Sequence, residues 1–304
     1  MSPTRWSTRG FATIPGSDAQ SPPPPRASAY PELRRFLRHK GAVTGSVLLL
    51  VLIAMAVAAP WLAPYDPIAQ DQRASLRAPG SAHLLGTDVF GRDILTRVIW
   101  GGRQSLRVGL LAVAVGGVPG TVLGLLAGFY RGWTGTVVLR LTDLLLALPG
   151  ILLALTIVAA TGPSLENLIV AVGVSSMPAY VRVVNGAVLD VTTRTFIEAS
   201  RASGAADLRV LGRHVVPNVL APIIVLSTLG LGNALLVAAT LSFLGLGAQP
   251  PTPEWGAMLS QGREFIFGYW WIATFPVVAI LLAVIGANLL GEGMRDLLDP
   301  RLRV

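Results

Sequence analysis

The stretch EASRASGAADLRVLGRHVVPNVLAP, residues 198–222, lies between two long apolar runs and decides how the rest of the chain is interpreted. It combines small residues with arginines, and Pro217 is expected to end the polar helix where the chain becomes apolar again. A helix face built from Ala199, Ser200 and Gly204 has little side-chain bulk, so it can enter a groove on a partner protein. The alternative is a connecting loop of small residues with basic anchors.

The composition indicates an integral membrane protein. The chain has 304 residues, of which 52% are hydrophobic and only 13% are charged. That charged fraction is about half of what a soluble domain carries. Several apolar runs reach the ~20 residues that a helix needs to cross a ~30 Å hydrocarbon core. A large soluble helical domain would need charged faces that these runs lack.

Six transmembrane helices are expected, at about 42–63, 104–129, 137–160, 165–185, 217–243 and 271–290. Residues 1–40 are expected to form a disordered cytoplasmic tail, and 41–304 the six-helix domain. The tail is rich in proline and has few apolar residues. Basic residues directly before the first span place the N-terminus in the cytoplasm. An even number of crossings then returns the C-terminus to the same side.

The net charge of +8 is explained by membrane topology and lipid headgroups, because the basic residues mostly flank apolar runs. We therefore expect lipid and no nucleic acid as a partner. The outer loop before the second span is an exception, since it is rich in arginine. Asp88, Arg92, Asp93 and Arg97 can form a local charge network that offsets this charge.

Two glycines and a tryptophan are assigned structural roles on the same side. Gly86 and Gly91 allow turns within the loop, and Trp255 can anchor the loop after the fifth span in the membrane interface. As an alternative, the segment that contains Gly86 and Gly91 forms a helix lying on the membrane surface. For the loop that contains Trp255, a structural lid and a substrate contact are equally well supported.

The sequence excludes several kinds of site. A P-loop requires a lysine, and the only lysine, Lys40, lies in Arg38-His39-Lys40-Gly41. No histidine pair has metal-ligand spacing, and the chain has no cysteine. Asp143 is the carboxylate nearest to a span centre, and the expected partner is Arg140, three residues earlier. We expect no catalytic site, no metal and no cofactor bound by this chain.

Polar residues inside spans usually face the bundle interior. The fifth span contains four such residues, which are the candidates for a translocation pathway: Ser227, Thr228, Asn233 and Thr240. Hydrogen bonding between helices explains them equally well.

The segment 198–217 resembles the EAA loop of the permeases of bacterial ABC importers. That pattern is Glu-Ala-Ala, three residues, Gly, nine residues, and then an apolar residue, any residue, an apolar residue and Pro. Glu198, Ala199, Gly204 and Pro217 match it, whereas Ser200 and His214 depart from it. The long N-terminal tail resembles that of the C-type subunit of the dipeptide, oligopeptide and nickel permeases. Three further segments resemble the same permeases: residues 83–110, 241–259 and 294–303.

This resemblance implies an all-α membrane protein of the six-helix ABC-importer permease type with a cytoplasmic coupling helix. The residues it assigns to ATPase coupling are Glu198, Ala199, Ser200, Arg201, Gly204 and Pro217. The implied partners are a second, homologous permease, two ATPase subunits or domains that bind ATP and Mg, and an extracytoplasmic solute-binding protein. The implied location is the bacterial cytoplasmic membrane, and the implied cargo is a dipeptide or oligopeptide.

Several alternatives stay open from the sequence. The cargo could instead be nickel or another peptide-like ligand. A stand-alone secondary transporter would need ionisable residues within the spans, which are scarce. A membrane-bound enzyme is the third alternative, although the sequence contains no catalytic constellation.

Overall fold

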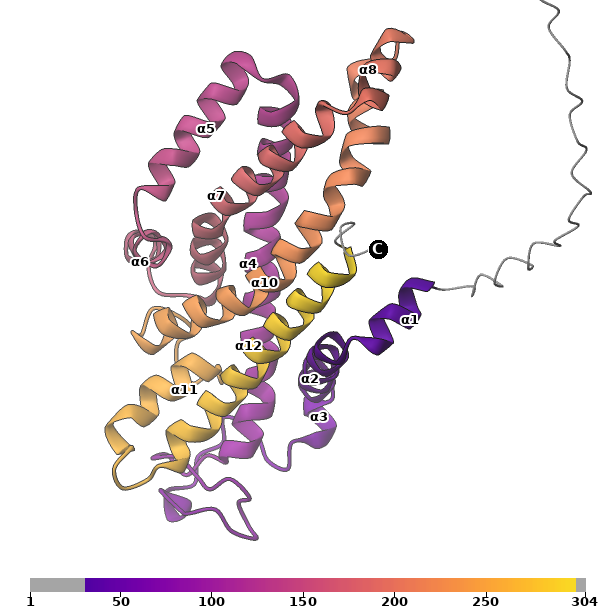
Figure 1. Cartoon of the computed structure of the whole chain (residues 1–304). Coiled ribbons are helices and arrows are strands. Elements are labelled where there is room, and N and C mark those ends of the chain that lie inside the picture. The colour runs from indigo at the N-terminus through magenta and orange to yellow at the C-terminus, as the bar shows by residue number, and fades with distance from the viewer. Residues whose placement is uncertain (1–30, 299–304) are drawn as a thin grey trace, which may run out of the picture.

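The computed structural model describes residues 31–298, and all regular elements in this range are helical (Figure 1). In chain order the elements are α1 (Pro31–Arg38), α2 (Lys40–Val57), α3 (Ala59–Leu62), η1 (Gln72–Ala74), α4 (Ile94–Tyr130), α5 (Gly132–Leu146), α6 (Gly150–Thr161), α7 (Leu165–Thr192), α8 (Thr195–Ala202), α9 (Asp207–Val210), η2 (Leu211–Val215), α10 (Val216–Phe243), α11 (Trp255–Gly262), η3 (Arg263–Phe265) and α12 (Trp271–Leu298).

The chain forms an all-α membrane fold with five long apolar helices, or six spans if α5 and α6 are taken as one broken span. The break between α5 and α6 is a bend of 87°. It follows Pro149, which supplies the N-cap of α6 but has no N–H to continue a helix from α5. The third expected span, 137–160, is therefore interrupted between α5 and α6.

The directions of the helices show that α5 and α6 together return the chain to the other end of the bundle. Gly116 of α4 faces Gly173 of α7, and Gly128 faces Val188. Both residue numbers increase together, so α4 and α7 run parallel. Because α4 and α7 run in the same direction, the chain must return from the end of α4 to the start of α7 at the opposite end of the bundle. Helices α5 and α6 form this return. The bent pair thus completes a bundle of six spans.

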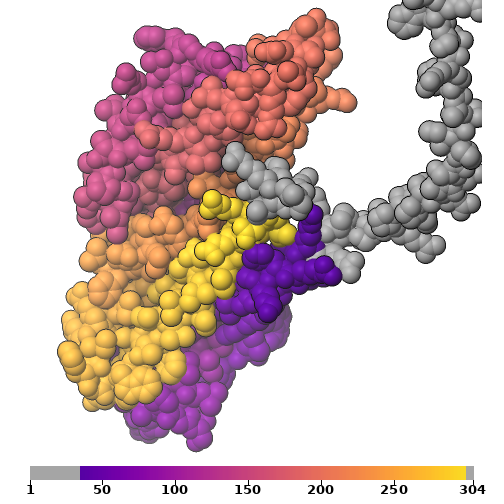
Figure 2. All heavy atoms as spheres, in the orientation of Figure 1, coloured from indigo at the N-terminus to yellow at the C-terminus, as the bar shows by residue number. Residues whose placement is uncertain are grey.

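The start of the first span and the end of the last one lie side by side. His39 Nε2 is 3.0 Å from Asp296 Oδ2, and a Cβ on Gly45 would lie 2.5 Å from the backbone nitrogen of Leu290. Gly232 of α10 in turn faces Asn288. Helix α12 therefore packs between α10 and α2, as its position in Figure 2 also shows.

Several predicted boundaries were wrong. Helix α4 begins at Ile94, ten residues before the expected start, so part of the expected outer loop is helical. Helices α7 and α12 continue to Thr192 and Leu298, beyond the apolar residues that were used to set their ends. Residues 31–38 of the expected disordered tail form α1. Residues 1–30 of that tail and the C-terminal 299–304 lie outside the described residues.

Glycines provide the closest packing in the core. Gly116, Gly120, Gly124 and Gly128 recur every four residues along one face of α4, and a Cβ at each would collide with α7. Such spacing allows two membrane helices to approach at backbone distance. The packing of α4 on α7 is the most extensive helix contact in the described structure.

Candidate functional site: the α8 surface and the network at the α11 end

Helix α8 lies at one end of the bundle, between the end of α7 and the start of α9, which continues through η2 into α10 (Figure 1). Ile197 anchors it, since this side chain is only 1% exposed and packs with Val191, Val210 and Val215. The predicted contact residues Glu198 and Ala199 lie on the other side of the helix and are exposed. The segment is therefore a helix fixed to the bundle by one face and open on the other.

Gly204 ends α8 in a left-handed conformation, with φ +81°. Its N–H donates to the carbonyl of Arg201 at 2.9 Å, and the N–H of Ala205 donates to that of Ser200 at 3.2 Å. These are the two hydrogen bonds of a Schellman cap, in which glycine is favoured at this position. Nothing in the described structure lies within 4 Å of a Cβ built on Gly204. Gly204 thus ends the helix through its left-handed conformation, and the space around its Cα is open.

Arg201 makes contacts within the chain, although its side chain is 49% exposed. Its guanidinium carbon lies 5.2 Å from the centre of the Phe129 ring, and Nη2 is 3.9 Å from Asp207 Oδ1. These contacts connect α8 with the end of α4 and with the start of α9. Arg201 therefore helps to position α8.

Pro217 does not end a cytoplasmic helix, contrary to the prediction. Residues Asp207–Phe243 form one continuous helix of 37 residues. A π-helical turn, η2, precedes the proline, and the N–H of Val216 donates to the carbonyl of Leu211. The side-chain amide of Asn218 donates to the carbonyl of His214 at 2.7 Å. The wider turn and this amide accommodate a proline that would otherwise break the helix.

The four pathway candidates on α10 do not meet at one place. The hydroxyl of Tyr180 on α7 donates to Ser227 Oγ at 3.5 Å, so Ser227 points toward a helix contact. Thr228 and Thr240 donate to carbonyls of their own helix. Asn233 and Thr240 are exposed and lie two turns apart on one face. This exposed pair lies on a surface that a second protein can reach, whereas Ser227 and Thr228 are half-buried.

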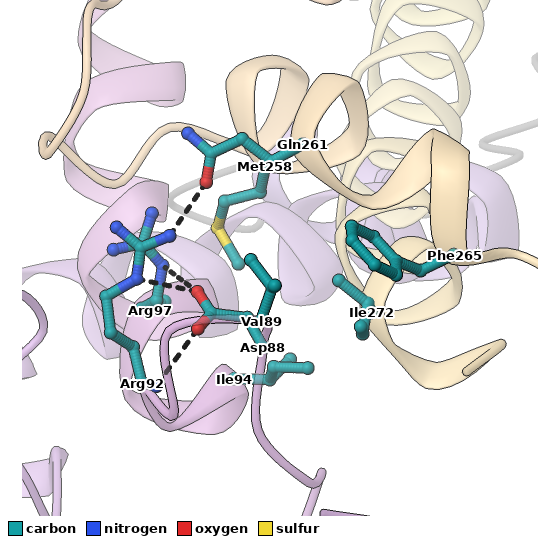
Figure 3. A pocket seen from close by; sticks show the side chains of 9 residues that line it. All are labelled: Asp88, Val89, Arg92, Ile94, Arg97, Met258, Gln261, Phe265 and Ile272. Atoms are coloured by element: carbon teal, nitrogen blue, oxygen red, sulfur yellow. Dashed lines mark hydrogen bonds and ion pairs between the residues drawn. The ribbon is translucent and has the colours of Figure 1, made fainter. Parts of the chain in front are cut away.

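A buried charge network occupies the opposite end of the bundle, beside α11 (Figure 3). Asp88 Oδ2 accepts a hydrogen bond from Arg92 Nε at 2.6 Å and lies 3.8 Å from Arg97 Nε. Arg92 Nη2 donates to Gln261 Oε1 at 2.9 Å, and Arg97 Nη1 donates to the carbonyl of Pro67 at 2.9 Å. Arg92 is 2% exposed and Arg97 is 1% exposed. Both arginines are thus structural.

The loop that leads into α4 is shaped by the predicted turn residues. Gly86 and Gly91 have φ of +79° and +73°, which glycine adopts at no steric cost. Asp93 caps α4 by accepting from the N–H of Thr96 at 2.8 Å. Its other oxygen lies 3.0 Å from His83 Nδ1.

Trp255 is not an anchor in the membrane interface, contrary to the prediction. It is only 2% exposed and packs in a core cluster against α4. Its indole Nε1–H donates to the carbonyl of Val98 at 2.8 Å. The loop after the fifth span therefore folds onto the bundle through this residue.

Comparison with known proteins identifies the family of this bundle. A family profile described as "Binding-protein-dependent transport system inner membrane component" matches residues 120–304, and one described as "N-terminal TM domain of oligopeptide transport permease C" matches residues 33–79. The chain belongs to this permease family. It is a membrane-spanning permease subunit of an ABC importer and a multi-pass inner-membrane protein.

Curated relatives match along most of the chain. The di/tripeptide transport system permease protein DppC of Pseudomonas aeruginosa is 47% identical over 274 residues, which cover 88% of this chain and 90% of the relative. The glutathione transport system permease protein GsiD of Pectobacterium atrosepticum is 46% identical over 271 residues, covering 89% of this chain and 90% of the relative.

A solved structure shares the fold. The permease chain of the inward-facing MetNI methionine ABC transporter superimposes with a TM-score of 0.57 at 21% identity. The match covers 68% of this chain and 98% of that one. At this identity the likeness concerns the fold alone.

Two residues that hold the permease bundle together were missed from the sequence. Glu254, 3% exposed, accepts hydrogen bonds from Ser105 Oγ at 2.9 Å and from the N–H groups of Gly256 and Ala257. An acidic residue directly before a helical stretch is a signal for an N-cap. The partner Ser105 is 149 residues away, and no local pattern connects the two.

Asp143 has a different partner from the one expected. Its carboxylate accepts from Arg182 Nη2 of α7 at 2.6 Å, so the ion pair joins α5 to α7 rather than closing one turn with Arg140. The described residues contain no group of three or more His, Asp or Glu side chains that could hold a metal ion.

Proposed function

We propose that this permease imports dipeptides or oligopeptides as one half of a translocation pathway. It works with a second, homologous permease, with two ATPase subunits or domains that bind ATP and Mg, and with an extracytoplasmic solute-binding protein. The chain itself carries no ATPase site and no catalytic residue. The names of the relatives support a peptide cargo, since they include di/tripeptide and glutathione permeases.

The observation that carries the coupling role is the arrangement of α8. One face is buried through Ile197, and the opposite face is exposed, with small residues at Ala199, Ala202 and Gly204. A partner that grips the exposed face can therefore displace the helix as a unit.

The anchoring of α8 explains how such a displacement reaches the spans. Ile197 belongs to one buried cluster with Val188 of α7 and Val219 of α10, while Arg201 contacts the end of α4. Movement of α8 accordingly acts on three spans at once. Closure of the ATPases on ATP favours one packing of these spans, and release favours the other, which is a shift between two populations.

The proposed orientation places α8 and both chain ends in the cytoplasm. The basic residues Arg35, Arg38 and Lys40 precede or begin the first span, and the α8 segment is also rich in arginine. The loop from 63 to 93 and helix α11 then face the binding protein. The burial of Arg92 and Arg97 explains why so many arginines are tolerated on that side.

The test compares two substitutions at Gly204 in the tagged, assembled importer. Gly204→Asn keeps a residue that tolerates a left-handed conformation, whereas Gly204→Trp adds bulk to the exposed face. We expect Gly204→Asn to retain ATPase co-purification and peptide uptake. Gly204→Trp should reach the membrane at near-normal abundance and lose most of both.

Gly232→Trp is the control for bulk inside the bundle. A Cβ at Gly232 would lie 2.8 Å from Asn288 Oδ1, so a tryptophan there should lower the amount of assembled permease itself. If Gly204→Trp binds the ATPase and transports normally, α8 is not the docking surface. If Gly204→Asn and Gly204→Trp fail equally, the cap conformation rather than the open surface is what matters.

A further inference from the structure

A groove with a cationic end lies between α2 and α4, apart from both surfaces described above. It has a volume of about 410 Å³. Ile53 of α2 and Leu110 and Leu111 of α4 line its apolar part, and Arg103 and Arg107 line its polar part. The two arginines are four residues apart, so they lie on the same face of α4.

Both guanidinium groups are free to bind an anion. Arg103 and Arg107 are exposed, and neither forms an ion pair with any residue of the described part of the chain. The Arg103 guanidinium lies 5.1 Å from the centre of the Trp100 ring, a contact that directs it along the surface of α4. This contrasts with Arg97 and Arg92, six and eleven residues before Arg103, which are buried and share Asp88.

The position of the arginines along α4 matches a membrane boundary. Helix α4 has 37 residues, so it is ~55 Å long and exceeds a ~30 Å hydrocarbon core. From Val108 to Phe129 it contains no charged residue. Arg103 and Arg107 are therefore the last charges before the apolar part. Trp61 and Tyr65, which follow α2, are exposed aromatic residues of the type found at this boundary.

We propose that this groove binds an anionic phospholipid from the leaflet on the α11 side. The phosphate contacts Arg103 and Arg107, and an acyl chain lies along Ile53, Leu110 and Leu111. The groove changes from cationic to apolar in the direction in which a phospholipid changes from headgroup to acyl chain. Unpaired basic residues within a span are costly unless they reach headgroups or a partner. This proposal does not depend on which cargo the importer carries.

The experiment measures phosphatidylglycerol binding to the assembled importer by native mass spectrometry from mixed phosphatidylglycerol and phosphatidylcholine. Arg103→Gln with Arg107→Gln removes the cationic end, and Ile53→Trp fills the apolar end without changing charge. We expect about thirty-fold weaker phosphatidylglycerol binding at this site in the double variant, the size expected for losing two basic residues at an anionic surface. Phosphatidylcholine binding should change little.

Matched controls separate this site from general charge and bulk. Arg73→Gln with Arg77→Gln removes the same charge from the exposed loop before α4, and Val47→Trp adds the same bulk to an exposed position of α2 outside the groove. Both should bind phosphatidylglycerol like the wild type. Equal lipid binding by all variants overturns the proposal. So does cross-linking of the groove to the second permease, or lost uptake with unchanged lipid binding in the arginine variant.

Discussion

Asp88 is the carboxylate that the two buried arginines of the α11 end share. Its side chain is 9% exposed and contacts both Arg92 and Arg97. Asp88→Asn leaves two buried cations with one neutral partner, and breaking a buried pair in this way costs ~3–5 kcal/mol. We predict a clear fall in the thermal unfolding temperature of the purified permease and in its membrane abundance.

The control is the same substitution in an exposed pair. Asp190 and Arg194, at the α8 end of α7, are 2.8 Å apart, but their side chains are 70% and 51% exposed. Such pairs contribute ~0–1 kcal/mol, so Asp190→Asn should leave the unfolding temperature almost unchanged. Equal effects of Asp88→Asn and Asp190→Asn would mean that the network at the α11 end is not structural.

At the level of single residues, local geometry was easier to anticipate than contacts over long distances. The turns at Gly86 and Gly91 follow from residue type alone. Glu254 and Trp255 instead take their roles from α4, about 150 residues earlier in the chain. The sequence around Trp255 resembles an interfacial anchor, and only the folded bundle shows that α4 buries it.

At the level of elements, the contact of α4 with α7 depends on glycine. A Cβ on Gly124 would lie 2.8 Å from both Val184 Cβ and the carbonyl oxygen of Val181. Gly124→Ala therefore forces the helices apart, at a cost of ~1–3 kcal/mol for overpacking. We predict a lower unfolding temperature and less assembled permease in the membrane.

Gly186 of α7 is the matched control, because nothing lies within 4 Å of a Cβ built there. Gly186→Ala should be neutral or slightly stabilising, since alanine favours helix more than glycine does. A loss of stability in Gly186→Ala equal to that in Gly124→Ala would show that helix propensity or the membrane, rather than the α4–α7 contact, determines the effect.

The existence of the spans was predictable from hydropathy, whereas their ends were not. Helix α4 begins at Ile94, directly after its N-cap Asp93, well before the uncharged apolar stretch that starts at Val108. Pro217 was expected to end a helix, but the π turn before it allows the helix to continue. In both cases the deciding interaction is a specific hydrogen bond. Average hydropathy carries no information about such bonds.

At the level of the whole molecule, the parallel packing of α4 and α7 determines the number of crossings. A re-entrant α5–α6 pair would leave the chain at the end where α4 finishes, and α7 would then run antiparallel to α4. The contacts of Gly116 with Gly173 and of Gly128 with Val188 have the opposite order. The sequence alone suggested the same count from length and apolar composition.

The proposed orientation can be measured directly, because the chain contains no cysteine. Single substitutions Ser81→Cys, Thr161→Cys and Ser203→Cys each place one thiol at an exposed position. With an impermeant maleimide on spheroplasts, Ser81→Cys and Thr161→Cys should react before lysis, and Ser203→Cys only after it. Reaction of Thr161→Cys only after lysis would contradict α5–α6 as a crossing. Reaction of Ser203→Cys before lysis would place α8 outside the cell, where no ATPase can bind it.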